Sequence, residues 1–345
     1  MMRSFSGISI FIWLVLVACS PKKPQLENGI WRGVIEMQEQ SLPFNFEIDQ
    51  TNGVIISLVN GTEKIPLDEI EFFGDSIRIV MHIFDSEIRA RVNSDTLNGY
   101  FVKNYAPEFK YPFSAGAGES FRFVKDETQS SVDFSGTYGV EFLHEEDTIS
   151  EISIAVGIFK QNGNTVTGTF LMNNGDYRFL QGNVVDSELW LSTFDGNHSF
   201  IFRANKYGDT LRGDFWSGAA WHETWTGIKD DNATLPKNES LTYLREGFEK
   251  IEFSFPDLEG IPVTDEDDRF KNKVVILQIF GTWCPNCMDE TKFLANWYKE
   301  NQKRGVEILG LAYERKDDFD YASGRVRKMK QRLGVDYDFC HCRHV

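Results

Sequence analysis

The feature that most restricts the fold of this chain is a pair of cysteines, Cys284 and Cys287, directly behind a long apolar run. The run covers residues 274–280 and is continuous rather than alternating, which is typical of a strand buried on both faces of a parallel sheet. The residues after the pair have helical spacing, with one predicted face formed by Phe293, Leu294 and Trp297. We therefore predict a strand, a turn that carries both cysteines, and a helix.

This placement predicts redox chemistry. Cys284 is the expected nucleophile, because unpaired N–H groups and the helix dipole favour a thiolate at a helix N-terminus. Pro285 costs no hydrogen bond in the first turn, and the spacing brings Cys287 within disulfide distance as the resolving thiol. Half of a zinc site is the alternative, but it needs a second ligand pair. The buried strand and the motif neighbours favour redox use, and these neighbours are Trp283, Pro285 and Asn286.

The body of the chain, from about residue 29 to 229, has a different pattern. Short runs alternate apolar and polar residues, as in residues 54–59, and end in turn residues such as Asn60 and Gly61. This period of two predicts antiparallel sandwiches or barrels. Three tryptophans near its end (Trp216, Trp221 and Trp225) either pack in the core or form a stacking platform, and core packing is the commoner role.

The β-rich body repeats itself once. Gly29-Ile30-Trp31-Arg32-Gly33 resembles Gly136-Thr137-Tyr138-Gly139, and Asp95-Thr96-Leu97-Asn98-Gly99 resembles Asp209-Thr210-Leu211-Arg212-Gly213. Asp75-Ser76 leading to Phe84-Asp85 resembles Asp186-Ser187 leading to Phe194-Asp195. We predict two copies of one β-module, at 27–126 and 133–229, then a linker at 230–242 and an α/β domain at 243–345.

The first residues resemble an export signal with a lipobox. A short charged start precedes an apolar stretch that is too brief to span a bilayer, and the stretch ends at Leu16-Val17-Ala18-Cys19. We expect 1–19 to be a lipoprotein signal region, with Cys19 lipidated and the protein anchored at the cell envelope, facing the periplasm or the exterior. A plain secretory peptide with a chance cysteine is the alternative. The remaining four cysteines form two close pairs, so the body is not a disulfide scaffold.

Net charge limits the range of partners. The formal charge of −16 argues against nucleic acid, since binding to phosphates draws on clustered Lys and Arg. The expected partners are thiol- or disulfide-bearing exported proteins, and the membrane through the lipid on Cys19. We expect no cofactor and no metal.

From about Ile251 to Gly334 the chain resembles the thioredoxin superfamily, and within it the TlpA-type extracytoplasmic oxidoreductases. The resemblance rests on the redox motif, a hairpin at 253–263 and a further strand at 305–313. It implies that Glu290, three residues after the second cysteine, helps to tune the thiols. Gln278 stands where thioredoxin has a buried Asp, so Glu290 or water would accept the proton. The peroxiredoxin branch is the weaker alternative, because its Thr three residues before the peroxidatic cysteine is missing.

The end of the chain departs from that family pattern. No proline follows Pro285, so we expect the cis-Pro loop and the final strands to be absent, leaving an open apolar edge on the strand at 274–280. A truncated or frameshifted reading frame is one expectation. Cys340-His341-Cys342-Arg343-His344 offers metal ligands or a Cys340–Cys342 disulfide as weaker alternatives.

The predicted fold class is therefore multidomain, with tandem antiparallel all-β modules followed by an incomplete α/β thioredoxin-like domain. The predicted function is thiol:disulfide exchange on exported proteins through Cys284 and Cys287. The alternatives are a weakly active copy in which the β-modules are a binding or spacer unit, and a peroxiredoxin-like peroxidase.

Overall fold

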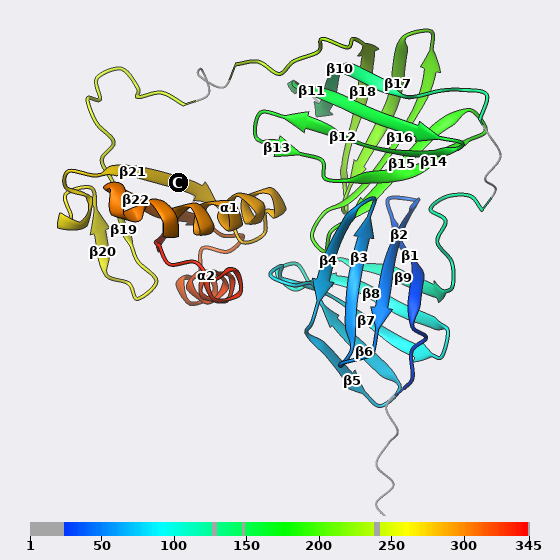
Figure 1. Cartoon of the computed structure of the whole chain (residues 1–345), viewed down its shortest axis with the longest axis horizontal. Coiled ribbons are helices and arrows are strands. Elements are labelled where there is room, and N and C mark those ends of the chain that lie inside the picture. The colour runs from blue at the N-terminus through cyan, green and yellow to red at the C-terminus, as the bar shows by residue number, and fades with distance from the viewer. Residues whose placement is uncertain (1–23, 126–129, 147–148, 238–241, 344–345) are drawn as a thin grey trace, which may run out of the picture.

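The computed structural model describes residues 24–125, 130–146, 149–237 and 242–343. Two β-rich modules follow one another along the chain, and an α/β domain lies beside both of them (Figure 1). The predicted fold class is confirmed, with tandem antiparallel modules first and a thioredoxin-like region last. The predicted lipidation site, Cys19, lies outside the described residues. Within the described residues, no helix is long and apolar enough to span a membrane.

The first module is an antiparallel sheet in the order β4-β3-β2-β1-β9-β8-β7-β6-β5. Its core holds Trp31, Phe44 and Phe101, all fully buried. Pairing of the first and last strands, with Val34 opposite Ser114, brings the two ends of the module together. The strands are β1 (Gly29–Met37), β2 (Gln40–Asp49), β3 (Ile55–Asn60), β4 (Glu63–Leu67), β5 (Ile70–Phe73), β6 (Ser76–Val80), β7 (Ser86–Asn93), β8 (Thr96–Lys103) and β9 (Lys110–Ala117).

The second module has the order β11-β10-β18-β17-β16-β15-β14-β12-β13, and β11 also pairs with β12. That extra pairing, with Gly157 opposite Phe170, closes the sheet into a barrel. Aromatic side chains fill the barrel, among them Phe170 and Phe202. The strands are β10 (Gly136–Glu146), β11 (Ile149–Asn162), β12 (Thr165–Met172), β13 (Gly175–Asp176), β14 (Leu180–Val185), β15 (Glu188–Phe194), β16 (Ser199–Tyr207), β17 (Thr210–Ser217) and β18 (Trp221–Lys229).

The repeated sequence motifs occupy equivalent places in the two modules. Trp31 and Tyr138 begin the first strand of each module and are both fully buried. Gly99 and Gly213 lie where neighbouring strands approach closely: a Cβ at either position would meet a carbonyl oxygen of the adjacent strand at 1.9 Å. The repeated sequence motifs therefore correspond to equivalent strand packing in the two modules.

The C-terminal domain has a short antiparallel hairpin and then a parallel sheet in the order β21-β22-β23. The hairpin and the parallel arrangement agree with the expected family topology. Val326 and Met329 of α2 are buried. The elements are β19 (Ser254–Pro256), β20 (Pro262–Thr264), η2 (Asp268–Phe270), β21 (Val274–Phe280), α1 (Pro285–Asn301), η3 (Gln302–Arg304), β22 (Val306–Tyr313), α2 (Phe319–Leu333) and β23 (Asp338–Cys342).

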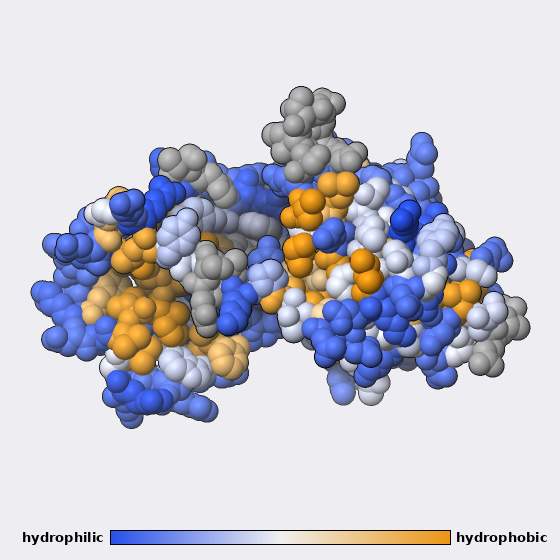
Figure 2. Space-filling view, turned by 90° about the horizontal axis from the view of Figure 1, so that it is seen from above, coloured by the Kyte–Doolittle hydropathy of each residue, from blue (hydrophilic) through white to orange (hydrophobic). Residues whose placement is uncertain are grey.

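Two burial predictions in this domain are wrong. Strand β21 is not buried on both faces: Val274 is 67% exposed and Ile279 70% exposed, because β21 pairs on one side only within the described residues. Phe293 is 65% exposed, since the buried face of α1 is formed instead by Met288, Thr291, Ala295 and Tyr298. The expected open apolar edge is thus present, and Figure 2 shows hydrophobic side chains gathered on this domain.

The last described strand places the Cys-x-Cys pair in the core. Cys340 and Cys342 are buried free thiols rather than a disulfide. Burial raises the pKa of Cys340 to about 12 and that of Cys342 to about 11, so both stay protonated at neutral pH. His341 packs edge-on against Phe319, and strand alternation turns it away from both thiols.

Candidate active site

The redox motif lies at the turn between β21 and α1. Cys284 is the N-cap residue of α1, and its Sγ accepts a hydrogen bond of 3.2 Å from the backbone N–H of Cys287. Pro285 occupies the first helical turn, and the two cysteines form a disulfide with a Cα–Cα distance of 5.2 Å. Both cysteines are half-buried. The arrangement puts one sulfur at the positive end of the helix dipole and the other one turn further along.

A buried carboxylate fixes the chain just before the cysteines. Glu314 accepts hydrogen bonds from the backbone N–H of Thr282 at 2.7 Å and from its hydroxyl at 2.8 Å. Burial raises the pKa of Glu314, although the bonds from Thr282 oppose that rise. Sequence reasoning missed this residue. The available signal was its position directly after β22, because the carboxyl ends of neighbouring parallel strands meet at one edge.

The tryptophan next to Cys284 is held on two sides. Trp283 Nε1 donates to the carbonyl of Tyr313 at 2.9 Å, and the guanidinium of Arg315 lies 4.2 Å from the centre of its ring. Arg315 also faces Tyr105 of the first module, with 5.3 Å between the guanidinium and the ring centre. The stacked cation fixes the ring orientation beside Cys284.

Behind the disulfide lies a short polar network. Gln278 Nε2 donates to Glu290 Oε2 and to Thr291 Oγ1, both at 3.0 Å, and Tyr337 donates to Gln278 Oε1 at 2.9 Å. The structure therefore connects Gln278, buried at the family's usual Asp position, to Glu290. Gln278 is thereby fixed in the orientation that presents its amide N–H groups to the carboxylate.

The second β-module directly contacts the turn between β21 and α1 that carries the two cysteines, which we call the redox turn. Asn286 Nδ2 donates to the carbonyl of Asp176 at 3.0 Å, and Asn197 Nδ2 donates to the carbonyl of Trp283 at 2.7 Å. Pro285, between these two contacts, is buried. Sequence reasoning did not anticipate this docking, since hydrogen bonds to backbone carbonyls have no residue signature.

Arg178 joins all three parts of the molecule. Its side chain is 7% exposed and pairs with Asp289 of α1 at 2.5 Å, with Glu63 of the first module, and more distantly with Asp195 at 3.8 Å. Burial would lower the pKa of Arg178, but the three carboxylates outweigh it and the net shift is upward. Burial also raises the pKa of Glu63, with Arg178 opposing. For Asp195 the burial effect is outweighed by His198 and backbone N–H groups, so its pKa is lowered.

A cavity of about 320 Å³ adjoins this ion cluster and reaches the redox helix. Its walls come from the first module, from Arg178 and Asp195 of the second, and from the two long helices of the C-terminal domain. The lining residues on α1 are Pro285, Met288, Asp289 and Lys292.

The other residues considered from sequence do not meet at one site. Trp225 is buried, whereas Trp221 is exposed and stacks on His144, with 3.9 Å between ring centres. Trp216 instead faces His222, at 5.3 Å between ring centres. The three tryptophans therefore do not form a single stacking platform. Among the described residues, no cluster of His, Cys, Asp and Glu has the arrangement of a metal site.

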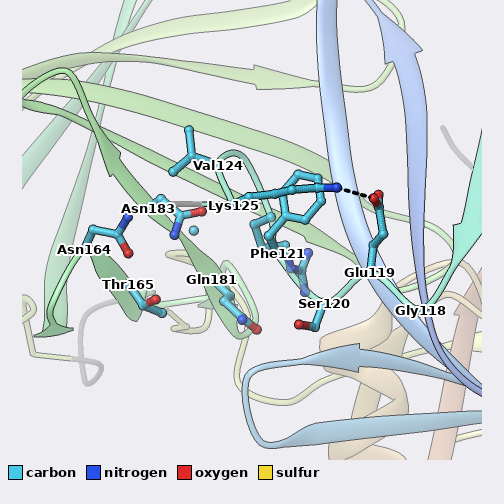
Figure 3. A pocket seen from close by; sticks show the side chains of 12 residues that line it. Gly118, Glu119, Ser120, Phe121, Val124, Lys125, Asn164, Thr165, Gln181 and Asn183 are labelled. Atoms are coloured by element: carbon cyan, nitrogen blue, oxygen red, sulfur yellow. Dashed lines mark hydrogen bonds and ion pairs between the residues drawn. The ribbon is translucent and has the colours of Figure 1, made fainter. Parts of the chain in front are cut away.

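A second, polar cavity of about 400 Å³ lies between the segment that joins the modules and the second barrel (Figure 3). Asn164, Thr165, Gln181 and Asn183 project into it from the barrel, and Lys125 pairs with Glu119 across the joining segment. Neither cysteine of the redox motif lines it. It belongs to the packing of the two modules.

The comparisons with known proteins agree on the C-terminal domain. Residues 248–341 match the AhpC/TSA family. The thiol-disulfide oxidoreductase ResA of Bacillus subtilis is 35% identical over 80 residues, which are 23% of this chain and 42% of that protein. The thiol:disulfide interchange protein DsbE of Vibrio cholerae is 36% identical over 72 residues, 21% of this chain and 36% of that protein.

A solved structure of a putative DsbE from Chlorobium tepidum has a TM-score of 0.23 at 16% identity, covering 27% of this chain and 59% of that one. The chain spans less than half the length of the ResA and DsbE relatives that it matches. Its C-terminal domain belongs to the thioredoxin superfamily. The relatives it resembles are named as thiol-disulfide oxidoreductases.

Proposed function

We propose that this chain is a thiol:disulfide oxidoreductase that acts on exported proteins through Cys284 and Cys287. The observation that carries the proposal is the position of Cys284 as N-cap of α1, with its sulfur accepting the N–H of Cys287. A negative sulfur at that position is stabilised by the helix dipole and the hydrogen bond together. The names of the ResA and DsbE relatives support the same chemistry.

The exchange proceeds in two balanced steps. In the reduced enzyme the Cys284 thiolate attacks one sulfur of a substrate disulfide, forms a mixed disulfide and expels the other substrate sulfur as a thiolate. Cys287 then loses its proton and attacks the sulfur of Cys284, which releases the second substrate thiolate. Two electrons pass to the substrate and the Cys284–Cys287 disulfide forms again. A dithiol donor returns the enzyme to the reduced state.

Neighbouring groups position these sulfurs and move the proton. Glu290 or water accepts the proton of Cys287, and Gln278 holds the Glu290 carboxylate through its 3.0 Å hydrogen bond. Glu314 fixes the backbone before Cys284 through Thr282. Trp283 and Asn286 border the surface that a substrate meets, and the buried Pro285 begins the helix between them.

The proposed cellular site of action is the cell envelope. The lipobox at Cys19 supports a lipid anchor in the cell envelope, with the catalytic domain facing the periplasm or the exterior. The substrates would then be exported proteins. Cys19→Ala should abolish lipid labelling and processing in cells, and wild-type processing should be sensitive to globomycin. Unchanged processing of the variant would reject the anchor.

The activity is tested with the full chain, dithiothreitol and insulin. Cys284→Ser should lower insulin reduction by about 100-fold or more, because the remaining thiol of the motif, Cys287, lies inside α1 and lacks the N-cap position that favours a thiolate. Cys287→Ser should accumulate the mixed disulfide. Cys340→Ala, which changes a buried thiol outside the turn, is the matched control. Equal rates for wild type and Cys284→Ser would reject the proposal.

The same assays also test two alternative functions. A weakly active copy, with the β-modules as a binding or spacer unit, is supported by the contacts of those modules with the redox turn. It predicts a folded chain with no turnover of insulin or of a small disulfide. Peroxidase activity is supported only by the AhpC/TSA match, and consumption of hydrogen peroxide that depends on Cys284 would establish it.

A further inference from the structure

The surface of the redox turn is partly occupied by the protein itself. The residues before and after Cys284-Pro285 are each hydrogen-bonded to the second β-module, at Trp283 and Asn286. The contact at Asn286 is close: a Cβ on Gly175 would come within 2.2 Å of Asn286 Nδ2. Gly175 has φ +143°, so both the backbone conformation and the close approach require glycine.

One buried cation holds this contact. Arg178 follows Gly175 in the same loop and carries the ion pairs to Asp289 and Glu63, which belong to the C-terminal domain and the first module. Without the guanidinium, Glu63 would lose its ion pair, Asp289 would keep only Lys292 at 3.4 Å, and Asp195 only His198 at 3.0 Å. Loss of Arg178 therefore removes the one cation that all three carboxylates share and weakens the junction.

Polar contacts also connect α2 with the first module. On α2, Arg332 pairs with Asp68 at 2.9 Å and with Glu69, and Lys328 pairs with Glu69. Tyr321 donates to Asp85 at 2.8 Å. Apolar contacts are present as well, because buried residues of the first module and of the C-terminal domain belong to one hydrophobic cluster. Domains within one chain generally move relative to one another unless their interface is large and hydrophobic. The described residues between β18 and β19 contain no helix or strand that would fix the domain in place.

We infer that this arrangement is a closed state that Arg178 stabilises. In this state the β-modules admit small or extended disulfides to Cys284 and exclude folded protein surfaces. The inference rests on the proposed function and concerns its regulation. A thiolate attacks along the axis of the disulfide it breaks, so a folded partner must bring its backbone against the turn. The loops at Gly175 and Asn197 occupy that surface. A small disulfide needs only the half-buried sulfur of Cys284.

The test compares two substrates on the full chain. Wild type, Arg178→Gln and Asn197→Ala are reduced with dithiothreitol and assayed with 5,5′-dithiobis(2-nitrobenzoate) and with insulin. Opening should raise the ratio of insulin rate to small-disulfide rate by about fivefold or more in Arg178→Gln, and by less in Asn197→Ala, which removes one hydrogen bond. Arg212→Gln, an exposed arginine on β17 of the same module, is the control and should leave the ratio unchanged.

The outcomes separate this inference from the proposed function. A ratio that is unchanged or lower in both variants, with the small disulfide still reduced, overturns the closed state and leaves the oxidoreductase intact. Failure of wild type to reduce either substrate faster than Cys284→Ser rejects the proposed function itself. Melting curves show whether Arg178→Gln folds. If it does not, the comparison of substrate ratios between wild type and Asn197→Ala still tests the inference.

Discussion

The two β-modules share a sequence pattern but meet the C-terminal domain in different ways. The second module closes into a barrel through the pairing of β11 with β12, and its loops bind the redox turn. In the first module, β4 and β5 lie at the two ends of the strand order, and its acidic residues bind α2. The repeat has therefore kept the strand packing while the loops have diverged. In both modules, loops make these contacts with the C-terminal domain.

The repeated Phe-Asp motif illustrates that divergence. Asp85 in the first module accepts the hydroxyl of Tyr321 on α2. Asp195 in the second module instead pairs with His198 at 3.0 Å and lies 3.8 Å from Arg178. Both aspartates lie at the junction of the three domains. The same position thus accepts a hydrogen bond from a tyrosine hydroxyl in one copy and belongs to an ionic cluster in the other.

The largest expected effect tests whether the two β-modules pack their strands in the same way. Gly99→Ala and Gly213→Ala should each lower the free energy of unfolding by about 3 kcal/mol or more, because the added methyl meets a backbone oxygen that cannot move alone. Denaturant unfolding measures both. Gly116→Ala, where a Cβ meets nothing within 4 Å, is the matched control. A large effect at only one of the two glycines would show that the modules do not share their packing.

The next effect concerns the connection between the modules. Arg122 is buried and donates to Val59 O at 2.6 Å and to Pro43 O at 3.1 Å in the first module, and to Ser192 Oγ at 3.4 Å in the second. Burial and the charge of Arg32 lower its pKa to about 9. Arg122→Met should cost about 2 to 3 kcal/mol of unfolding free energy, since buried carbonyls lose their donor.

The control for that prediction is Arg91→Met. Arg91 is an exposed arginine of the first module that pairs with Asp75 at 3.1 Å, and an exposed pair contributes less than about 1 kcal/mol. An equal loss of stability in the two variants would show that Arg122 has no special role between the modules.

The smallest predicted effect uses a position at which the copies differ. Lys103 ends β8, and Ser217 holds the matching position at the end of β17. Burial, with the charge of Arg315, lowers the pKa of Lys103 to about 8 from 10.5. Below pH 8 the amine is charged in both folded and unfolded states, so its full burial penalty is present. Between pH 8 and 10.5 the unfolded state binds more protons, so stability rises with pH.

Lys103→Met should therefore raise the free energy of unfolding by about 2 kcal/mol at pH 7. The gain should shrink as the pH approaches 10.5, and thermal melts across pH 7 to 10.5 measure it. Lys110→Met, an exposed lysine on β9, is the control. A gain that stays constant with pH would mean that apolar packing, rather than titration, is responsible.

Much of the fold could be predicted from local patterns. Period-two alternation indicated the antiparallel modules, and the strand, Cys-Pro-Asn-Cys turn and helix indicated the thioredoxin-like domain. The errors lie where burial depends on a neighbour. Val274 and Ile279 are apolar, yet they are exposed because β21 has one partner strand in the described structure. Glu314 was missed because its role depends on a hydrogen bond to Thr282, which lies 32 residues earlier.

The sequence by itself determined where the disulfide lies: two cysteines separated by two residues at the start of a helix, behind a strand, are close enough to pair. It also determined that the two modules pack their strands in the same way, because the repeated motif keeps a glycine, Gly99 or Gly213, where two neighbouring strands approach closely. Only the tertiary structure decided what surrounds the disulfide. Arg178, Asn197 and Gly175 come from loops about 90 to 110 residues away, and their contacts follow from how three domains dock. Docking depends on shape and on paired charges, and neither has a local sequence period.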